Sequence, residues 1–318
     1  MLLRIYRGIG PGTVIVIIIT LILVWLKAFL NPVQADLYYN TNPAPLYSLI
    51  YGFFEIRPKL GILFSMLLVL IIGTYMVNFN TRLFFINERT FLPASLYVLF
   101  SGFISSIQIL NPVLPASLML IIAIDRLIVS YRKPGIAYNL FDSSLIIGLA
   151  ALLYTNIIWF YLLIIAGISL FRSFNLRELL LSLAGIFTPY IVLFSFYYLS
   201  GRDLAGLGNY LLDSLITDVP DFYWSPAFIV VSSINLFILI ISLMQLLSIY
   251  NTKKVRSRKI FTLFTFMLLL TVIIYFAVPS ASVELMYVFL LPLVYILTHY
   301  LVMMRNKKIA NRFMKLTI

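Results

Sequence analysis

Apolar runs of about twenty residues recur from one end of the chain to the other, and this repetition constrains the fold more than any other feature. Each run is long enough to cross the roughly 30 Å hydrocarbon core of a bilayer as an α-helix. Only 11% of the 318 residues are charged, whereas a soluble domain has about 25%. The sequence therefore predicts an all-α polytopic membrane protein, with one integral membrane domain over residues 1–318.

We expect about ten transmembrane helices, near residues 11–30, 60–78, 91–106, 112–129, 143–155, 157–171, 178–199, 226–250, 260–278 and 283–304. Several are short and paired as hairpins. The 29 uncharged residues between Asp142 and Arg172 would form a helix about 44 Å long, too long for one upright crossing. A hairpin that turns at residues 154–156 instead keeps Arg172 on the same side as Arg132.

The basic residues indicate the orientation of these helices. With ten crossings and a cytoplasmic N-terminus, 19 of the 23 Lys and Arg residues fall on the cytoplasmic side, as the positive-inside rule requires. We therefore predict a multi-pass protein of a bacterial inner (plasma) membrane with both termini in the cytoplasm. The net charge of +12 then reflects topology and attraction to anionic lipid, and nucleic acid is not an expected partner.

Two predicted external segments, 31–59 and 200–225, are too long to be simple turns. In each, apolar residues recur at helical spacing, over residues 43–56 and 203–216. Amphipathic helices of this kind lie at the membrane surface. We expect these two interfacial helices to pack against each other.

Three stretches resemble the GT-C superfamily of membrane glycosyltransferases. An acid followed by "NPAPLYSLIYGFF" is similar to the first external loop of that family. The stretch "FDSSLIIGLAALLYTNIIWFYLLIIAGISLFR" resembles its short hairpin, and "VPSASVELMYVFLLPLVYILTHYL" resembles its late helix. The similarity covers about residues 11–300. Many members carry a second acid in or near the first loop, whereas here Asp36 stands alone until Glu55, and the chain is shorter than most members.

The resemblance implies a GT-C-like helix arrangement and an enzyme that takes a sugar from a polyprenyl-phosphate carrier at the outer face of the inner membrane. Asp36 is then the candidate catalytic residue, because an acceptor hydroxyl needs a base or a carboxylate-held metal ion near the anomeric carbon. The alternative interpretation of Asp36 is a solvated loop charge.

Arg57, Lys59 and Arg202 are candidate lipid-phosphate-binding residues, since a phosphate needs positive charge on the external side. Their alternative interpretation is snorkelling of long side chains at the interface. The cofactor is unknown. A divalent cation is one candidate, with carboxylate ligands from Asp213, Asp218 and Asp221, although these acids also fit a solvated loop.

The remaining polar residues favour structural roles. Glu284 is expected to stabilise a helix N-terminus, and His299 to lie near the inner membrane interface. The absence of cysteine excludes disulfides and thiol catalysis. A single histidine argues against a His-based zinc site or a Ser-His-Asp triad.

Three functions compete at this point. The first is the transferase. The second is a non-catalytic scaffold or regulatory subunit of an envelope-assembly or secretion complex, which would bind other envelope membrane proteins. The third is a transporter, and it is the weakest because the predicted spans carry almost no charge at mid-depth, where transporters place ionisable residues.

Overall fold

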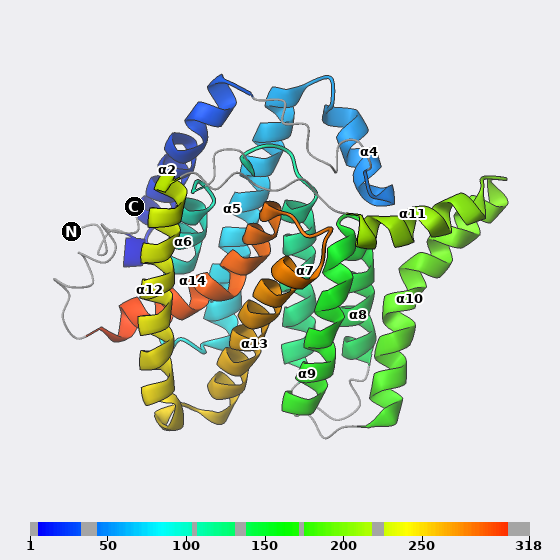
Figure 1. Cartoon of the computed structure of the whole chain (residues 1–318). Coiled ribbons are helices and arrows are strands. Elements are labelled where there is room, and N and C mark those ends of the chain that lie inside the picture. The colour runs from blue at the N-terminus through cyan, green and yellow to red at the C-terminus, as the bar shows by residue number, and fades with distance from the viewer. Residues whose placement is uncertain are drawn as a thin grey trace.

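The computed structural model describes residues 6–32, 43–103, 107–130, 138–171, 175–217 and 226–304. Within these ranges the secondary structure is entirely helical, and Figure 1 shows the arrangement of the helices. The twelve α-helices are α2 (Pro11–Leu30), α4 (Pro45–Phe54), α5 (Pro58–Leu83), α6 (Leu92–Phe100), α7 (Val113–Val129), α8 (Tyr138–Ala151), α9 (Tyr161–Phe171), α10 (Leu176–Leu199), α11 (Leu204–Ile216), α12 (Pro226–Ser248), α13 (Val255–Ala277) and α14 (Met286–Met303). Three short 3-10 helices accompany them: η2 (Thr155–Phe160), η3 (Tyr250–Thr252) and η4 (Val283–Leu285).

Five of the described helices are long and apolar enough to cross a membrane: α2, α5, α10, α13 and the continuous η4–α14 segment. The composition of its helices thus makes this chain a multi-pass membrane protein. Each of the ten ranges predicted from the sequence overlaps a helix, although α6 and α9, of 9 and 11 residues, are shorter than the predicted ranges. The sequence predicts helix positions well because each apolar run must satisfy its own backbone hydrogen bonds within lipid.

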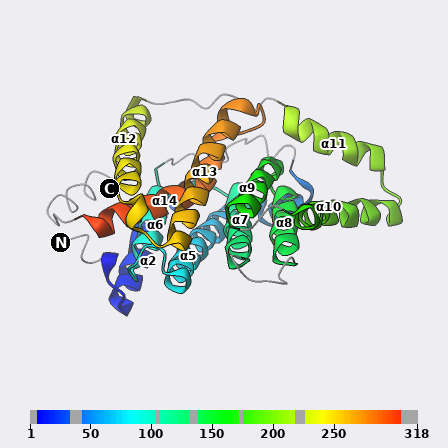
Figure 2. The same cartoon turned by 90° about the horizontal axis from the view of Figure 1, so that it is seen from below.

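The η4–α14 segment lies at the centre of the bundle. Most of its residues are buried, and α14 lies between α13 and α6 when the molecule is viewed from below (Figure 2). An aromatic cluster surrounds its second half, where the rings of Phe85 and Phe264 lie 5.2 and 4.8 Å from the ring of Tyr295. The polar groups of a helix that is buried on every side must find their hydrogen-bond partners inside the protein.

The contact between α8 and α10 depends on glycine. A Cβ atom at Gly148 would lie 2.6 Å from the carbonyl oxygen of Ile186, and one at Gly185 would lie 2.5 Å from that of Phe141. Small residues allow membrane helices to approach this closely. The predicted hairpin of 143–155 and 157–171 is therefore fixed against α10 by its first helix.

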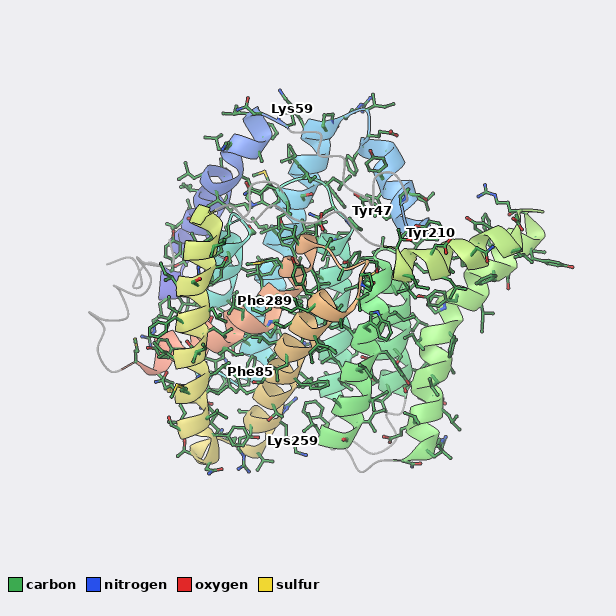
Figure 3. The ribbon with its side chains drawn as sticks, in the orientation of Figure 1. Tyr47, Lys59, Phe85, Tyr210, Lys259 and Phe289 are labelled. Carbon is green, nitrogen blue, oxygen red and sulfur yellow. The ribbon has the colours of Figure 1, made fainter. Side chains whose placement is uncertain are left out.

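The bundle has two chemically different ends. We call the end where α4 packs beside the start of α5 the α4-side end, and the other the opposite end. Lys59 lies at the first and Lys259 at the second (Figure 3). Of the described Lys and Arg residues, four lie within or beside helix ends at the α4-side end (Lys27, Arg57, Lys59 and Arg202) and ten lie toward the opposite end (Arg7, Arg82, Arg89, Arg126, Arg177, Lys253, Lys254, Arg256, Arg258 and Lys259).

Charged contacts tie helices together at the opposite end. Arg7 donates to Glu88 at 2.5 Å, and this hydrogen bond raises the pKa of the Arg7 guanidinium. Arg82 near the end of α5 pairs with the buried Asp125 of α7. Tyr75 donates to the same carboxylate at 2.7 Å. These contacts connect α5 to α7. They also connect the residues before α2 to the segment before α6.

Lys253 makes a further contact at the opposite end. Its amine lies against Nε2 of His299 and 4.9 Å from the centroid of the Phe261 ring. Burial lowers the pKa of Lys253 to about 8. We expected His299 at the membrane interface, but its side chain is fully buried, because the loop before α13 folds over it and supplies Lys253.

Both segments predicted as interfacial helices are helical, as α4 and α11. The α4 helix folds back beside the start of α5, where the rings of Phe54 and Phe64 stack at 5.1 Å. The α11 helix runs from the far end of α10 back to the ends of α8 and α9 (Figure 1). Both reach the same bend after α8. Leu46 donates its N–H to the carbonyl of Leu152 at 3.1 Å, and the hydroxyl of Ser214 donates to that of Thr155 at 3.1 Å.

Candidate functional site at the α4-side end

The turn between α6 and α7, residues 107–111, gathers hydrogen bonds from several helices. Its carbonyl oxygens accept from Tyr47 on α4 (3.2 Å), Ser65 on α5 (3.2 Å) and Tyr287 on α14 (3.1 Å). The turn forms here because Asn111 caps α7, its Oδ1 accepting from the N–H of Leu114 at 3.1 Å, and because Pro112 follows. These carbonyls lie outside any α-helix and need partners from elsewhere, and here side chains of other helices supply them.

A second set of hydrogen bonds joins the bend after α8 to the turn between α13 and α14. Asn156 donates to the carbonyl of Ser280 at 2.8 Å and accepts from the Ser280 hydroxyl at 2.9 Å. The Ser280 hydroxyl also lies 3.0 Å from the carbonyl oxygen of Leu215 at the end of α11, so its one hydrogen is shared between two acceptors. We call residues 107–111, 152–156 and 278–284 together the turn cluster. It is covered by α4 and α11, since both helices hydrogen-bond to it.

Tyr47 is the main connection between α4 and the turn cluster. Its side chain is fully buried, and its hydroxyl donates to the carbonyl of Leu110. Burial raises the pKa of Tyr47 well above its usual range. The phenol therefore keeps its proton and remains a donor at every physiological pH.

Glu284 is the unusual residue of the turn cluster. Only 1% of its surface is exposed, and the hydroxyl of Ser282 donates to its carboxyl group. The ion pairs of the described residues, Arg7–Glu88 and Arg82–Asp125, both lie at the opposite end. A buried carboxyl group with no cation beside it is costly when ionised, so Glu284 is not the simple helix-terminal acid that the sequence indicated.

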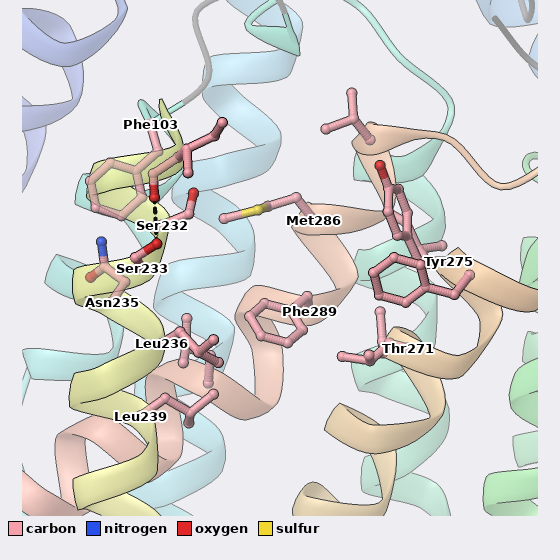
Figure 4. A pocket seen from close by; sticks show the side chains of 16 residues that line it. Phe103, Ser232, Ser233, Asn235, Leu236, Leu239, Thr271, Tyr275, Met286 and Phe289 are labelled. Atoms are coloured by element: carbon pink, nitrogen blue, oxygen red, sulfur yellow. Dashed lines mark hydrogen bonds between the residues drawn. The ribbon is translucent and has the colours of Figure 1, made fainter. Parts of the chain in front are cut away.

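An apolar groove of about 470 Å³ lies between α12, α13 and α14 (Figure 4). Side chains from all three helices line it, among them Leu236, Leu239, Tyr275, Met286 and Phe289. Leu236 is 56% exposed, so the groove opens on the flank of the bundle. Its volume lies within the range of about 300–1,000 Å³ that is typical of small-molecule sites.

The groove runs up to the turn cluster. Val283 and Leu285 line it, while Glu284 between them is buried. One end of the groove is thus apolar and open to the flank, and the other adjoins a polar region. This arrangement suits a molecule with a long apolar chain and a polar head.

The structure separates the residues that the sequence predicted to share a ligand. Arg57 and Lys59 are exposed at the corner between α4 and α5. Arg202 is exposed in the turn between α10 and α11, with its guanidinium 5.6 Å from the ring centroid of Tyr197. Figure 1 shows that turn at the outer edge of the molecule, apart from the α4–α5 corner. Asp36 lies outside the described residues.

Of the three acids proposed as ligands of a divalent cation, one lies in the described part of the chain. Asp213 is exposed on α11, and Asp218 and Asp221 lie outside the described residues. In the part of the chain that the structure describes, no three acidic or histidine side chains are grouped so that they could hold a metal ion.

Sequence reasoning gave Glu284 only a structural role. One signal was present, because Glu284 is the single charged residue between Lys259 and Arg305. An ionisable residue in so long an apolar stretch commonly has a function. Nothing in the sequence indicated the groove, because the surfaces of α12, α13 and α14 that form it have the same apolar composition as a lipid-facing surface.

Comparison of the chain with protein-family models, curated proteins and solved structures finds no match.

Proposed function

We propose that this protein is a GT-C-like membrane glycosyltransferase that uses a polyprenyl-phosphate-linked sugar. The observation that carries the proposal is the apolar groove between α12, α13 and α14, which opens on the flank of the bundle and ends at the turn cluster. A lipid-linked substrate has this same division into an apolar chain and a polar head. The chain would enter the groove from the bilayer and leave its head at the α4-side end.

In this proposal the α4-side end faces outward from a bacterial inner membrane, and both termini are cytoplasmic. Ten helices cross the bilayer in a GT-C-like arrangement. The uneven distribution of the described basic residues, ten toward the opposite end and four at the α4-side end, supports this orientation through the positive-inside rule. Both α4 and α11 then lie at the outer boundary of the membrane.

The phosphate of the carrier would bind at the corner between α4 and α5. Arg57 and Lys59 are exposed there. Two cations side by side favour a phosphate group. Arg202 lies in a different turn, so we assign the phosphate to Arg57 and Lys59 and keep Arg202 as a membrane-surface anchor.

Asp36 is the proposed general base. Its carboxylate accepts the proton of the acceptor hydroxyl while the acceptor oxygen forms a bond to the anomeric carbon. The bond between that carbon and the phosphate oxygen breaks, and the carrier leaves as a polyprenyl phosphate. The cations at the α4–α5 corner stabilise the charge on this leaving group.

Transfer assays with Asp36→Asn test the proposal. Membranes or nanodiscs that contain the protein would be supplied with polyprenyl-phosphate sugars and their lipid or glycan acceptors. Loss of a general base costs about 10²–10⁴-fold in rate, so Asp36→Asn should abolish detectable transfer at normal expression. Glu55→Gln, at the next acid and exposed at the corner, is the matched control and should retain activity. Equal transfer by both variants would rule out Asp36 as the base, whereas no transfer by the parent protein would favour the scaffold or regulatory subunit.

A further inference from the structure

The loop between α12 and α13 is rich in cations, and the two helices that it joins carry no acid. Five of the seven residues from 253 to 259 are Lys or Arg, and no Asp or Glu occurs between residues 226 and 277. We propose that this loop binds the headgroup of an anionic phospholipid, in the leaflet that surrounds the opposite end of the bundle. The proposal does not depend on the glycosyltransferase function, because it uses no residue of the candidate site.

The local structure opposes this accumulation of positive charge. The first turn of α13 contains no acid, although cations at a helix N-terminus are unfavourable with respect to the helix macrodipole. Lys254 and Arg258 are four residues apart, and like charges at this spacing repel each other. No described carboxylate forms an ion pair with Lys254, Arg256 or Arg258. An anion from outside the described part of the chain would therefore stabilise this loop.

Side-chain contacts hold the loop in one conformation. Lys253 is 8% exposed and connects the loop to α14 through its contact with His299. The hydroxyl of Tyr250 in η3 lies 2.9 Å from that of Thr262 on α13, and the guanidinium of Arg258 lies 5.6 Å from the centroid of the Tyr250 ring. Figure 1 shows α12 and α13 meeting at this loop, at the end of the bundle away from α4. The cations around the loop are thus positioned before any ligand binds.

Apolar side chains are exposed beside the cations. On the last turns of α12, Met244 and Leu247 are 65% and 69% exposed, and Val255 at the start of α13 is 43% exposed. Lys254 and Arg256 are exposed on either side of Val255 in the sequence. A surface of this kind fits a molecule with acyl chains and an anionic head, since basic residues at the end of a membrane helix attract anionic lipid. A free phosphate would use the cations alone.

Native mass spectrometry of the full chain tests this proposal, with lipid titrated in mixed micelles of phosphatidylglycerol and phosphatidylcholine. The parent protein should retain phosphatidylglycerol preferentially. Lys254→Gln combined with Arg256→Gln should weaken that retention on the order of thirtyfold, since each cation near an anionic surface contributes about a factor of five. Arg126→Gln combined with Arg177→Gln is the matched control. It also removes two exposed cations from the opposite end and should leave the retention unchanged.

A further variant separates the geometry of the loop from its charge. Tyr250→Leu keeps every cation but removes the ring beside the Arg258 guanidinium and the hydroxyl that bonds to Thr262. The retention of phosphatidylglycerol should therefore fall severalfold in this variant, at unchanged net charge. The elution volume in size-exclusion chromatography checks that each variant keeps its fold.

Four results would overturn the proposal. Equal losses in the two double variants would mean that the basic end attracts anionic lipid only diffusely. Equal retention of the two lipids by the parent would leave the loop to another partner, such as an acidic protein segment. Full displacement of phosphatidylglycerol by millimolar inorganic phosphate would show that the loop binds phosphate without a lipid. Full retention by Tyr250→Leu would contradict the assigned geometry.

Discussion

The helices of this bundle are held together by different kinds of interaction at its two ends. At the opposite end, cations meet their partners across helices: Arg82 meets Asp125, Arg7 meets Glu88, and Lys253 meets His299. At the α4-side end, neutral hydroxyl, amide and carbonyl groups connect the turns, and the buried acid Glu284 has no cation among its described neighbours.

This difference indicates which end of the bundle can change its conformation more readily. An ion pair with a buried carboxylate is lost only at a high cost, so it fixes the helices that it joins. Neutral hydrogen bonds contribute about 0.5–1.5 kcal/mol each, and a hydroxyl can exchange one acceptor for another. We infer that the opposite end is the fixed base of the protein and that the α4-side end is the part that handles a ligand.

The strongest test of the fixed base is Arg82→Ala. This change leaves Asp125 buried with Tyr75 as its remaining donor. Removing one partner of a fully buried pair costs about 3–5 kcal/mol, and because Arg82 is 54% exposed we expect about 2–3 kcal/mol. Reversible unfolding in mixed micelles measures this loss. Adding Asp125→Asn should restore most of the stability, and an Arg82→Ala protein as stable as the parent would contradict the comparison.

The second test breaks the reciprocal pair of the turn cluster. Asn156→Leu removes both hydrogen bonds to Ser280 while keeping a similar side-chain volume. At about 1 kcal/mol for each bond, the expected loss is about 1–2 kcal/mol in the same unfolding measurement. Asn209→Leu is the control, since Asn209 is exposed on α11. Equal effects of the two changes would mean that the pair does not hold the turns together.

The third test removes a single hydroxyl from the α4 contact. Tyr47→Phe keeps the ring but leaves the carbonyl of Leu110 without this donor, for an expected loss of about 1 kcal/mol. The matched control is Tyr198→Phe, because Tyr198 is 72% exposed and its loss should be undetectable. A loss as large as that of Arg82→Ala would show that the α4-side end is as rigid as the base.

The smallest expected effect is a change in pH dependence at Lys253. Burial lowers its pKa to about 8 from the ordinary value of 10.5, so above pH 8 the unfolded chain binds more protons at this residue than the folded protein. Its contribution to stability therefore rises with pH between these two values. Lys253→Met should flatten the unfolding free energy over that window relative to the parent. Parallel pH profiles for the two proteins would contradict this assignment.

The helices could be predicted from the sequence because their cause is local. Each apolar run carries its own signal, and the hairpin turn predicted at 154–156 lies where α8 ends and η2 begins. The same reasoning placed helices at 43–56 and 203–216, where α4 and α11 occur. Local composition could not show how deeply each of these helices is covered by its neighbours.

The candidate site could be predicted only in part, because its contacts join distant parts of the chain. Asn156 and Ser280 are 124 residues apart, and no local pattern pairs them. Glu284 follows a turn, which favours a structural role, and only the packing of α4 and α14 shows that its carboxyl group is buried. The separation of Arg202 from Arg57 has the same origin, since it depends on the path of α10 and α11.

Photo-crosslinking of a lipid probe tests the central claim most directly, namely that the groove beside the turn cluster holds the chain of a lipid-linked substrate. The probe is a long-chain polyprenyl phosphate with a diazirine in its chain, added to the protein in nanodiscs. We predict labels on α12, α13 and α14, lost in Leu236→Trp, which fills the groove. Phe237→Trp, at an exposed neighbour on α12 that does not line the groove, should label normally. Equal labelling of the two variants, or labels spread over all lipid-facing helices, would contradict the account.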